Sequence, residues 1–314
     1  MAAVKNNRVE NEFCGILLVN KPEGFTSFDV IAKLRGILKM RKLGHAGTLD
    51  PMATGVLPVF AGKATAACDI LPINEKSYTA TFCLGKEYDT QDCTGSVVKE
   101  YDIRVTFDEV KKASLKFVGD IMQIPPMYSA VSVGGKRLYE LAREGKEVER
   151  KPRPMTIERF EICEFDEKTQ SGKVFISCSK GTYIRTLIHD LGQALQTGGY
   201  MTSLIRNSSS GFLLKDCKSL QEIQALADSG QLDSAFIPVE NAFACYKRIN
   251  LSQSQAKMHR NGVRLSLKKL SASNKEAFSQ EETFSIFCEG EFLGLAKSDL
   301  SKDELVSVKN FYKN

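Results

Sequence analysis

Long apolar segments are missing from this sequence. The longest apolar run, from Cys14 to Val19, is far too short to span a bilayer. The first ten residues contain Lys5, Arg8 and Glu10 with no apolar stretch behind them, so they do not have the pattern of a secretory leader. We therefore expect a cytoplasmic protein that does not associate with membranes.

Recognisable cofactor and metal motifs are also missing. The nine cysteines are scattered and never form a Cys-x-x-Cys pair, which argues against a disulfide framework and against a zinc site. We expect them to be reduced core residues. The sequence contains no phosphate loop, dinucleotide fingerprint or metal-ligand spacing, so we expect a protein that uses neither a cofactor nor a metal ion.

Neither sign of charge is in large excess. A net charge of +5 and a pI near 8.6 do not by themselves indicate a nucleic-acid partner. Two local clusters are more informative, and each is interpreted either as a solvated face or as an anchor for a polyanion. The first has no acidic residue within it, and the second is diluted by glutamates. They comprise Lys33, Arg35, Lys39, Arg41 and Lys42, and Arg143, Lys146, Arg150, Lys151 and Arg153.

The order of expected elements favours an α+β fold. Strands are predicted at residues 13–19, 78–84 and 174–178, and helices follow Thr26 or Ser27 and Gly181. Capping boxes predict two further helices, one ending near Phe117 and one near Ser229. Helices and strands alternate without a repeated unit, which favours a mixed or antiparallel sheet. The apolar stripes are Phe28, Ile31, Leu34 and Leu38, and Leu187, Leu191 and Leu195; the boxes are Thr106 with Glu109 and Ser219 with Glu222.

The composition changes near residue 250. With 314 residues the chain is long enough for two domains, and we place them at 1–249 and 250–314. A helix is expected from Leu251 to Arg260, followed by a polar stretch from Lys268 to Glu282 and a hairpin that turns at Glu289-Gly290. The second domain is therefore predicted to be small and rich in β structure.

One loop presents a nearly isolated carboxylate. Residues 44–57 contain Asp50 among three glycines, and Pro51 keeps Asp50 out of the helical region. Such a loop can offer a carboxylate to a ligand. An aspartate before proline is also a common turn starter, bonded to its own backbone, and that interpretation stays open at this point.

Six motifs in collinear order across about residues 13–212 resemble the TruB family of bacterial tRNA pseudouridine-55 synthases. The residue 44–57 loop is similar to the family's signature loop, and residues 125–143 resemble its RNA-gripping insertion, which we place at about 124–153 and name the insertion. The other matching segments are Leu18–Ser27, Lys76–Tyr78, Lys180–Arg185 and Leu204–Arg206. In relatives the position of Ser132 is commonly lysine, which puts one RNA phosphate contact in doubt. Members of the family usually carry an RNA-binding β-barrel of the PUA kind at the position of the C-terminal domain, so the resemblance implies a PUA-like domain here.

The resemblance implies an enzyme that isomerises uridine 55 in the T-loop of tRNA, working as a monomer without a cofactor or an obligate protein partner. It assigns catalysis to Asp50, Tyr78 and Arg185, with Arg185 as the cation beside Asp50. Expected substrate contacts are His45, Lys21, Tyr183, Leu204 and Arg206, and expected RNA-backbone contacts are Lys39, Arg41, Lys42, Arg150, Lys151 and Arg153.

Plainer interpretations of these residues remain. Arg185 also fits a surface helix arginine, Tyr78 and Leu204 fit core residues, and Lys21 fits a support for the loop or a phosphate contact. Two other functions are also open: an RNA chaperone whose chemistry is dispensable, and a synthase that acts within a guide-RNA complex. The intact insertion favours a stand-alone enzyme.

Overall fold

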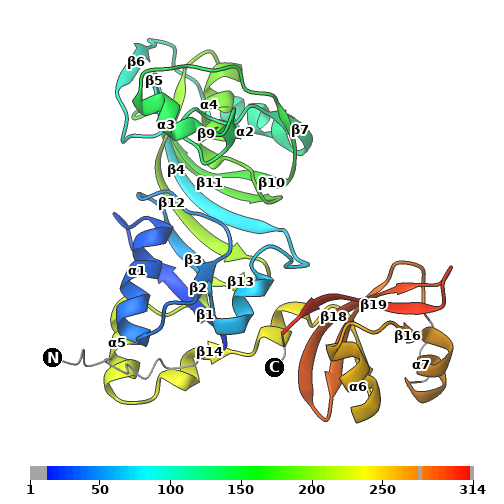
Figure 1. Cartoon of the computed structure of the whole chain (residues 1–314). Coiled ribbons are helices and arrows are strands. Elements are labelled where there is room, and N and C mark those ends of the chain that lie inside the picture. Colours follow the sequence, from blue (N-terminus) through cyan, green and yellow to red (C-terminus); the bar gives the residue numbers. More distant parts are fainter. Residues whose placement is uncertain (1–12, 275–277, 312–314) are drawn as a thin grey trace.

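A ten-stranded mixed sheet forms the centre of the computed structural model, which describes residues 13–274 and 278–311 (Figure 1). Lys5, Arg8 and Glu10 lie outside these residues. Within the described chain, β12 runs parallel to β3 and the other pairings in this sheet are antiparallel, which confirms the expected mixed sheet. The order along the sheet is β14 (Phe236–Ile237), β1 (Gly15–Lys21), β3 (Thr54–Ala61), β12 (Gly199–Ser209), β4 (Lys76–Leu84), β11 (Ser171–Cys178), β10 (Arg153–Asp166) and β7 (Gly119–Gln123); β2 (Leu43–His45) pairs with β3 and β13 (Phe212–Leu213) with β12.

Helices begin where the sequence supplies caps. The Thr26 hydroxyl accepts a hydrogen bond from the Asp29 N–H at 3.0 Å, and the Asp29 carboxylate accepts one from the Thr26 N–H at 2.8 Å. The predicted boxes at Thr106 and Ser219 are also present. In the described chain no helix is long and apolar enough to cross a membrane. The helices are α1 (Ser27–Leu38), α2 (Phe107–Ser114), α3 (Leu138–Arg143), α4 (Ile184–Ala194), α5 (Leu220–Asp228), α6 (Gln253–Arg260) and α7 (Leu267–Asn274).

Helices α1 and α5 cover one face of β1 and β3. The prediction that Phe28 belongs to the buried stripe of α1 is wrong, because its side chain is 63% exposed. At 100° per residue it lies about 120° from the centre of the stripe. The Arg35 guanidinium instead stacks over its ring, 5.7 Å from the centroid. The residues of α1 that do face the sheet are Val30, Ile31, Leu34, Ile37 and Leu38.

Helices α2 and α4 cover the other half of the sheet. On β4, Tyr78, Ala80, Phe82 and Leu84 are buried while the residues between them are partly exposed, as the alternating pattern predicted. They pack against Leu187 and the rest of the apolar stripe of α4 in one continuous core. This half of the sheet carries the candidate site.

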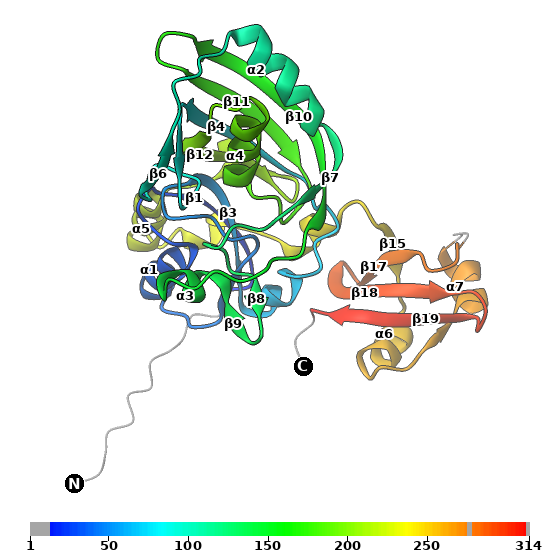
Figure 2. The ribbon, with the colours of Figure 1, turned by 90° about the horizontal axis from the view of Figure 1, so that it is seen from above.

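The insertion leaves the sheet after β7 and returns at β10 (Figure 2). It contains a short hairpin, β8 (Ser132–Val133) and β9 (Lys136–Arg137), followed by α3, in which Leu138 and Leu141 are buried. A second excursion, β5 (Lys86–Tyr88) and β6 (Val97–Glu100), follows β4. Both excursions place polar segments next to α4.

The C-terminal residues form a separate five-stranded sheet, so the expected β-rich region is present. The predicted hairpin at Glu289-Gly290 is confirmed. Helix α7 occupies part of the polar stretch, and its residues Leu267 and Leu270 are buried. Phe243 stacks with Phe292 and joins this sheet to the first. We keep the division at 249/250 as a proposal; it falls within β15, which pairs with β17 of this sheet. The order is β15 (Lys247–Asn250), β17 (Thr283–Cys288), β18 (Glu291–Asp299), β19 (Glu304–Asn310) and β16 (Leu265–Ser266).

The cysteines are all free thiols, but most are not core residues. Only Cys178 and Cys288 are fully buried, and four others are exposed, so the expectation of core positions is wrong for the majority. Several occupy loops and the solvent faces of strands, where a small apolar side chain is tolerated singly without packing. The exposed ones are Cys14, Cys93, Cys163 and Cys245.

Candidate active site

The loop that carries Asp50 runs between β2 and β3 and is anchored to the start of α1. The Ser27 hydroxyl accepts a hydrogen bond from the Leu49 N–H at 2.9 Å, and Leu49 itself is buried in the core beneath Tyr78 and α4. Gly47 has a φ of +75°, which favours glycine at this turn. Asp50 therefore projects from a fixed point rather than from a loose turn.

Two buried cations hold the same loop from below. The Lys21 ammonium donates to the carbonyls of Pro22, Phe25 and Pro51, which uses all three of its N–H bonds. Burial lowers the pKa of Lys21 to about 8. Arg206 is also fully buried, and its guanidinium donates to the Val56 carbonyl at 2.7 Å and to the Gly47 carbonyl at 2.9 Å. Both side chains support the loop; a contact with substrate stays a prediction for each.

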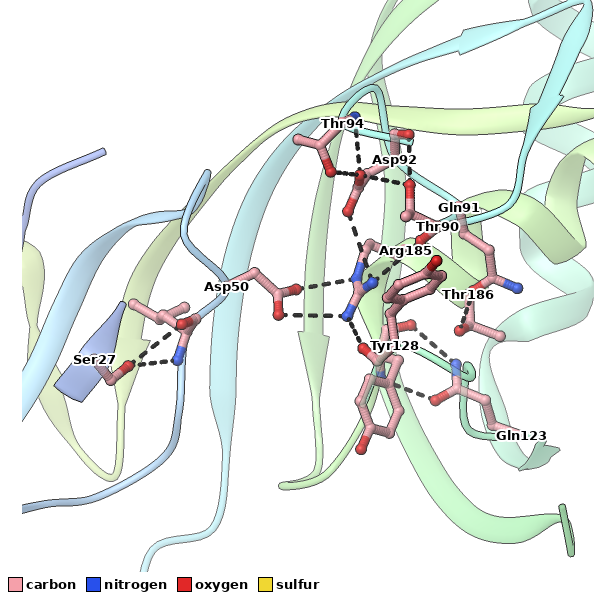
Figure 3. Close-up of polar contacts among 12 residues, drawn as sticks. Ser27, Asp50, Thr90, Gln91, Asp92, Thr94, Gln123, Tyr128, Arg185 and Thr186 are labelled. Atoms are coloured by element: carbon pink, nitrogen blue, oxygen red, sulfur yellow. Dashed lines mark hydrogen bonds and ion pairs between the residues drawn. The ribbon is translucent and has the colours of Figure 1, made fainter. Parts of the chain in front are cut away.

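Arg185 meets Asp50 from the first turn of α4 (Figure 3). Its Nε lies 3.0 Å from Oδ2 of Asp50, and its Nη2 lies 3.3 Å from Oδ1. The Asp50 side chain is 38% exposed, whereas that of Arg185 is only 6% exposed. Burial raises the pKa of Asp50, and the Arg185 charge opposes that rise. The carboxylate thus has a cation on its inner side and an open outer side.

A second carboxylate shares Arg185, and the sequence did not reveal it. The Asp92 carboxylate lies 3.7 Å from Nη1 of Arg185 and is almost fully buried. It accepts hydrogen bonds from the Thr94 N–H at 3.0 Å and from the Thr90 hydroxyl at 2.9 Å (Figure 3). Its charge also raises the pKa of Asp50. The one available signal was its position between two threonines, which is too common to single it out.

Arg185 also reaches two backbone carbonyls. It donates to the Thr90 carbonyl at 3.1 Å and to the Tyr128 carbonyl at 3.0 Å. Thr90 lies in the segment between β5 and β6, and Tyr128 lies in the insertion. A planar guanidinium with several N–H donors is suited to joining four partners in this way. The insertion is therefore in direct contact with the residue that binds Asp50.

Tyr78 and Leu204 line the same face of the sheet. Tyr78 pairs in register with Arg206, and Ala80 pairs with Leu204. Burial raises the pKa of Tyr78 to about 12, a rise that Arg206 opposes. Tyr183 is the N-cap residue of α4 and is half-buried. Tyr78 and Leu204 belong to the same apolar core as Leu49, the residue that precedes Asp50.

His45 and Lys76 lie on either side of Gly47. His45 is half-buried at the end of β2, and burial followed by the Arg206 charge lowers its pKa. Lys76 belongs to the matching motif but received no role in the sequence analysis; burial followed by Arg206 lowers its pKa to about 8. Its Nζ lies 2.7 Å from where a Cβ on Gly47 would stand. The Lys76 ammonium thus packs closely against the Asp50 loop at Gly47.

The basic residues that follow α1 lie at the opposite end of that helix from the Asp50 loop. Lys39, Arg41 and Lys42 are exposed beyond the C-terminal end of α1, whereas the N-terminal end of α1 anchors the Asp50 loop. At 1.5 Å per residue the two ends of this helix are about 17 Å apart. The closeness of Lys39, Arg41 and Lys42 to Asp50 in the sequence therefore does not show that they are close to it in space. Contact of these three residues with RNA stays a prediction.

The basic residues at the end of the insertion differ from one another. The Arg150 guanidinium lies 2.8 Å from the Glu147 carboxylate and donates to the Pro125 carbonyl at 3.3 Å, so it is partly occupied within the insertion. Lys151 and Arg153 are exposed. Of the three, these two are the better placed for an external anion. Among the described residues, no group of three or more His, Cys, Asp and Glu side chains converges on a metal position.

Comparison with known proteins gives consistent matches. The family model for the N-terminal domain of TruB family pseudouridylate synthases matches residues 35–184, and the model for the C-terminal domain of tRNA pseudouridylate synthase B matches residues 185–244. The tRNA pseudouridine synthase B of Lactococcus lactis subsp. cremoris (strain MG1363) is 44% identical over 79% of this chain and 77% of its own. That of Alkaliphilus oremlandii (strain OhILAs) is 40% identical over 89% of this chain and 91% of its own.

Solved structures support the fold. A Cbf5-Nop10-Gar1 complex contains a chain with a TM-score of 0.72 and 25% identity, covering 95% of this chain and 85% of that one. An H/ACA RNP bound to a substrate RNA containing 2'-deoxyuridine contains one with a TM-score of 0.71 and 22% identity, with the same coverage. The α+β architecture predicted from the sequence is therefore that of a known structural class.

Proposed function

Because this chain belongs to the TruB family of tRNA pseudouridine synthases, we propose that it isomerises the uridine at position 55 in the T-loop of tRNA, with Asp50 as the reacting carboxylate. The observation that carries the proposal is the half-exposed Asp50 carboxylate held from its inner side by buried Arg185. The position in tRNA rests on the family resemblance, and the role of Asp50 rests on the geometry as well.

The reaction needs no group donor. The bond between N1 of uracil and C1' of ribose breaks, a bond between C5 and C1' forms, and the proton lost from C5 is balanced by one gained at N1. A carboxylate can add to the sugar or to the base, or it can stabilise positive charge at the ribose. The open outer side of Asp50 allows each of these, and the choice among them stays open.

Arg185 keeps Asp50 useful for this chemistry. A buried carboxylate without a partner tends to bind a proton, and burial and the Asp92 charge both act in that direction here. The Arg185 charge acts against them, and its two contacts with the carboxylate also fix its orientation. We propose that Arg185 keeps the Asp50 carboxylate ionised and fixes its orientation.

Tyr78 is assigned mainly to binding. With its pKa raised to about 12, the side chain is a neutral phenol near pH 7 and is a poor acceptor for the C5 proton. Its ring and the side chain of Leu204 provide an apolar surface for an extruded uracil. The uridine must leave its stack to reach Asp50, and the family resemblance assigns His45 to stacking in the space it vacates.

The contacts of the insertion favour a stand-alone enzyme over one that acts within a guide-RNA complex. The Tyr128 carbonyl accepts a hydrogen bond from Arg185, so the element expected to grip RNA is part of the site itself. A pure RNA chaperone would need no such connection between RNA grip and a carboxylate–arginine pair. The fold likeness to chains from H/ACA complexes concerns architecture only.

The test is nucleoside analysis after incubation of the purified protein with an unmodified T-arm hairpin. We expect one uridine, that at position 55, to become pseudouridine, and a hairpin with cytidine there to remain unmodified. Asp50→Asn should abolish the product while hairpin affinity stays within a few-fold, because the shape is kept and the charge is lost. Product formed by Asp50→Asn at a rate near wild type would refute the role of Asp50, and binding without product from the wild type would favour a chaperone.

A further inference from the structure

Gln123 closes a pair of hydrogen bonds on the backbone of Tyr183 (Figure 3). Its Oε1 accepts from the Tyr183 N–H at 2.8 Å, and its Nε2 donates to the Tyr183 carbonyl at 3.1 Å. The Gln123 side chain is 1% exposed, and no side chain caps α4 from within the helix. Thr186, the residue that could take the Tyr183 N–H in a capping box, instead donates to Gln91 at 2.7 Å. A glutamine from another strand thus performs the capping.

Gln123 lies at the point where the insertion leaves the sheet. Gln123 is the last residue of β7, where it pairs with Arg153 of β10, and the insertion lies between those two strands. The capped turn of α4 carries Arg185 two residues after Tyr183. Tyr128, five residues after Gln123, accepts a hydrogen bond from the same Arg185. The base of the insertion therefore holds both the helix turn and the guanidinium that binds Asp50.

We propose that Gln123 is a positioning residue that ties the base of the insertion to the Arg185–Asp50 ion pair and so sets the geometry of that pair. The inference rests on the proposed function. Arg185 touches Asp50 at 3.0 and 3.3 Å, and a displacement of about 1 Å in such an arrangement can cost about a hundredfold in rate. Without the two Gln123 hydrogen bonds, the first turn of α4 keeps the contact of Arg185 with the Tyr128 carbonyl.

The chain contains a matched control in Gln170. Its Oε1 accepts from the Val105 N–H at 2.9 Å and its Nε2 donates to the Val105 carbonyl at 2.9 Å, and it is 6% exposed. Gln170 thus holds Val105 as Gln123 holds Tyr183, and its Nε2 also donates to the Glu167 carbonyl at 2.8 Å. None of these partners is Asp50, Arg185 or a residue of the insertion. Gln123→Met removes two hydrogen bonds and Gln170→Met removes three, both at nearly constant side-chain volume, so the control loses at least as much hydrogen bonding as the variant under test.

The experiment measures single-turnover pseudouridine formation against pH at saturating T-arm hairpin, together with hairpin affinity and thermal midpoint. Both variants should lower the midpoint. Only Gln123→Met should slow the rate, by about ten- to a hundredfold, and move the acidic limb of the profile upward while affinity stays within a few-fold. Gln123→Glu, which keeps the acceptor for the Tyr183 N–H, should recover part of the rate.

Three outcomes decide the matter. If Gln123→Met matches Gln170→Met in rate and pH profile, Gln123 is only structural and the inference is wrong. If Gln123→Met does not fold, the same comparison is made with Gln123→Glu, whose rate and acidic limb must then differ from those of Gln170→Met. If the wild type forms no pseudouridine, the proposed function fails first, which is a different result from equal behaviour of two active variants.

Discussion

Replacing Arg185 with methionine removes a cation that contacts two carboxylates. Asp50 and Asp92 then face each other without the guanidinium, which contacts them at 3.0 and 3.7 Å. A neighbouring opposite charge lowers a carboxyl pKa by about one to three units. Because the Asp50 side chain is 38% exposed and solvent screens part of the interaction, we expect the lower part of that range. The acidic limb of the pH–rate profile should therefore move upward by about one to two pH units.

Stability should respond with a defined sign. Burial already holds the folded pKa of Asp50 above its ordinary value, so ionising Asp50 opposes folding. The protonated form of Asp50 therefore contributes to the free energy of unfolding. This contribution is fully present below the pKa of Asp50 in the unfolded chain and is lost as pH rises through its pKa in the folded protein. In Arg185→Met the folded pKa is higher still, so the loss of stability with rising pH should extend to higher pH than in the wild type. Thermal unfolding measured over the same pH range as the rates checks this.

Two further variants separate charge from geometry. Arg185→Lys keeps a positive charge but lacks the planar guanidinium that donates to Asp50 and two carbonyls at once. The acidic limb of its pH–rate profile should stay near that of the wild type, while the maximal rate falls. Arg264→Met removes an exposed arginine that pairs with Glu304 at 2.7 Å, and it should change neither quantity measurably. The reasoning is refuted if the acidic limb of Arg185→Met coincides with that of the wild type.

The remaining predictions concern RNA binding, the loop and the C-terminal sheet. Neutralising Lys151 and Arg153 together should flatten the plot of log affinity against log salt by about 1.5 units, whereas Arg150→Ala, already paired within the insertion, should change it less; equal slopes in all variants would mean a solvated face. Gly47→Ala should lower the free energy of unfolding by about 1–2 kcal/mol through its φ of +75°, measured by urea titration, and slow turnover as well; unchanged turnover would contradict the loop's role. Burial lowers the pKa of His259, whose two ring nitrogens have no partner among the described residues, so stability should fall as pH drops below the ordinary value near 6.5. His259→Leu should weaken this dependence in thermal melts from pH 7 to about 5, leaving the part due to His45, whose pKa is also lowered by burial. A dependence as steep as that of the wild type would refute the role of His259.

Features with a local physical cause were predictable from the sequence. The capping boxes at Thr106 and Ser219 and the alternation along β4 depend on neighbours a few residues apart, and the structure has them. The contact of Arg185 with Asp50 was also expected, from the need of a buried carboxylate for a fixed cation and from the family resemblance. The roles assigned to these residues stay predictions.

Features that depend on distant partners were not predictable. Asp92 meets Arg185 across more than ninety residues of sequence, and Gln123 meets Tyr183 across sixty, and neither pair leaves a periodic trace. Phe28 shows the limit of periodicity itself, because its spacing from Ile31 fits a helix face while its angle lies outside the buried stripe. The basic residues after α1 precede the Asp50 loop closely in the sequence, but the length of α1 separates them from the end of the helix that anchors this loop.

The strand order of the main sheet has a consequence for synthesis on the ribosome. Strands β3 and β4 both emerge early, but their shared neighbour β12 is made only at residues 199–209. At ordinary rates of translation the two edges wait on the order of ten seconds for it. During that time both expose unpaired backbone, a surface that a chaperone can bind and that a second nascent chain can join. Arg206, which holds the Asp50 loop, arrives with the same strand, so we expect the candidate active site to be assembled in the last third of translation.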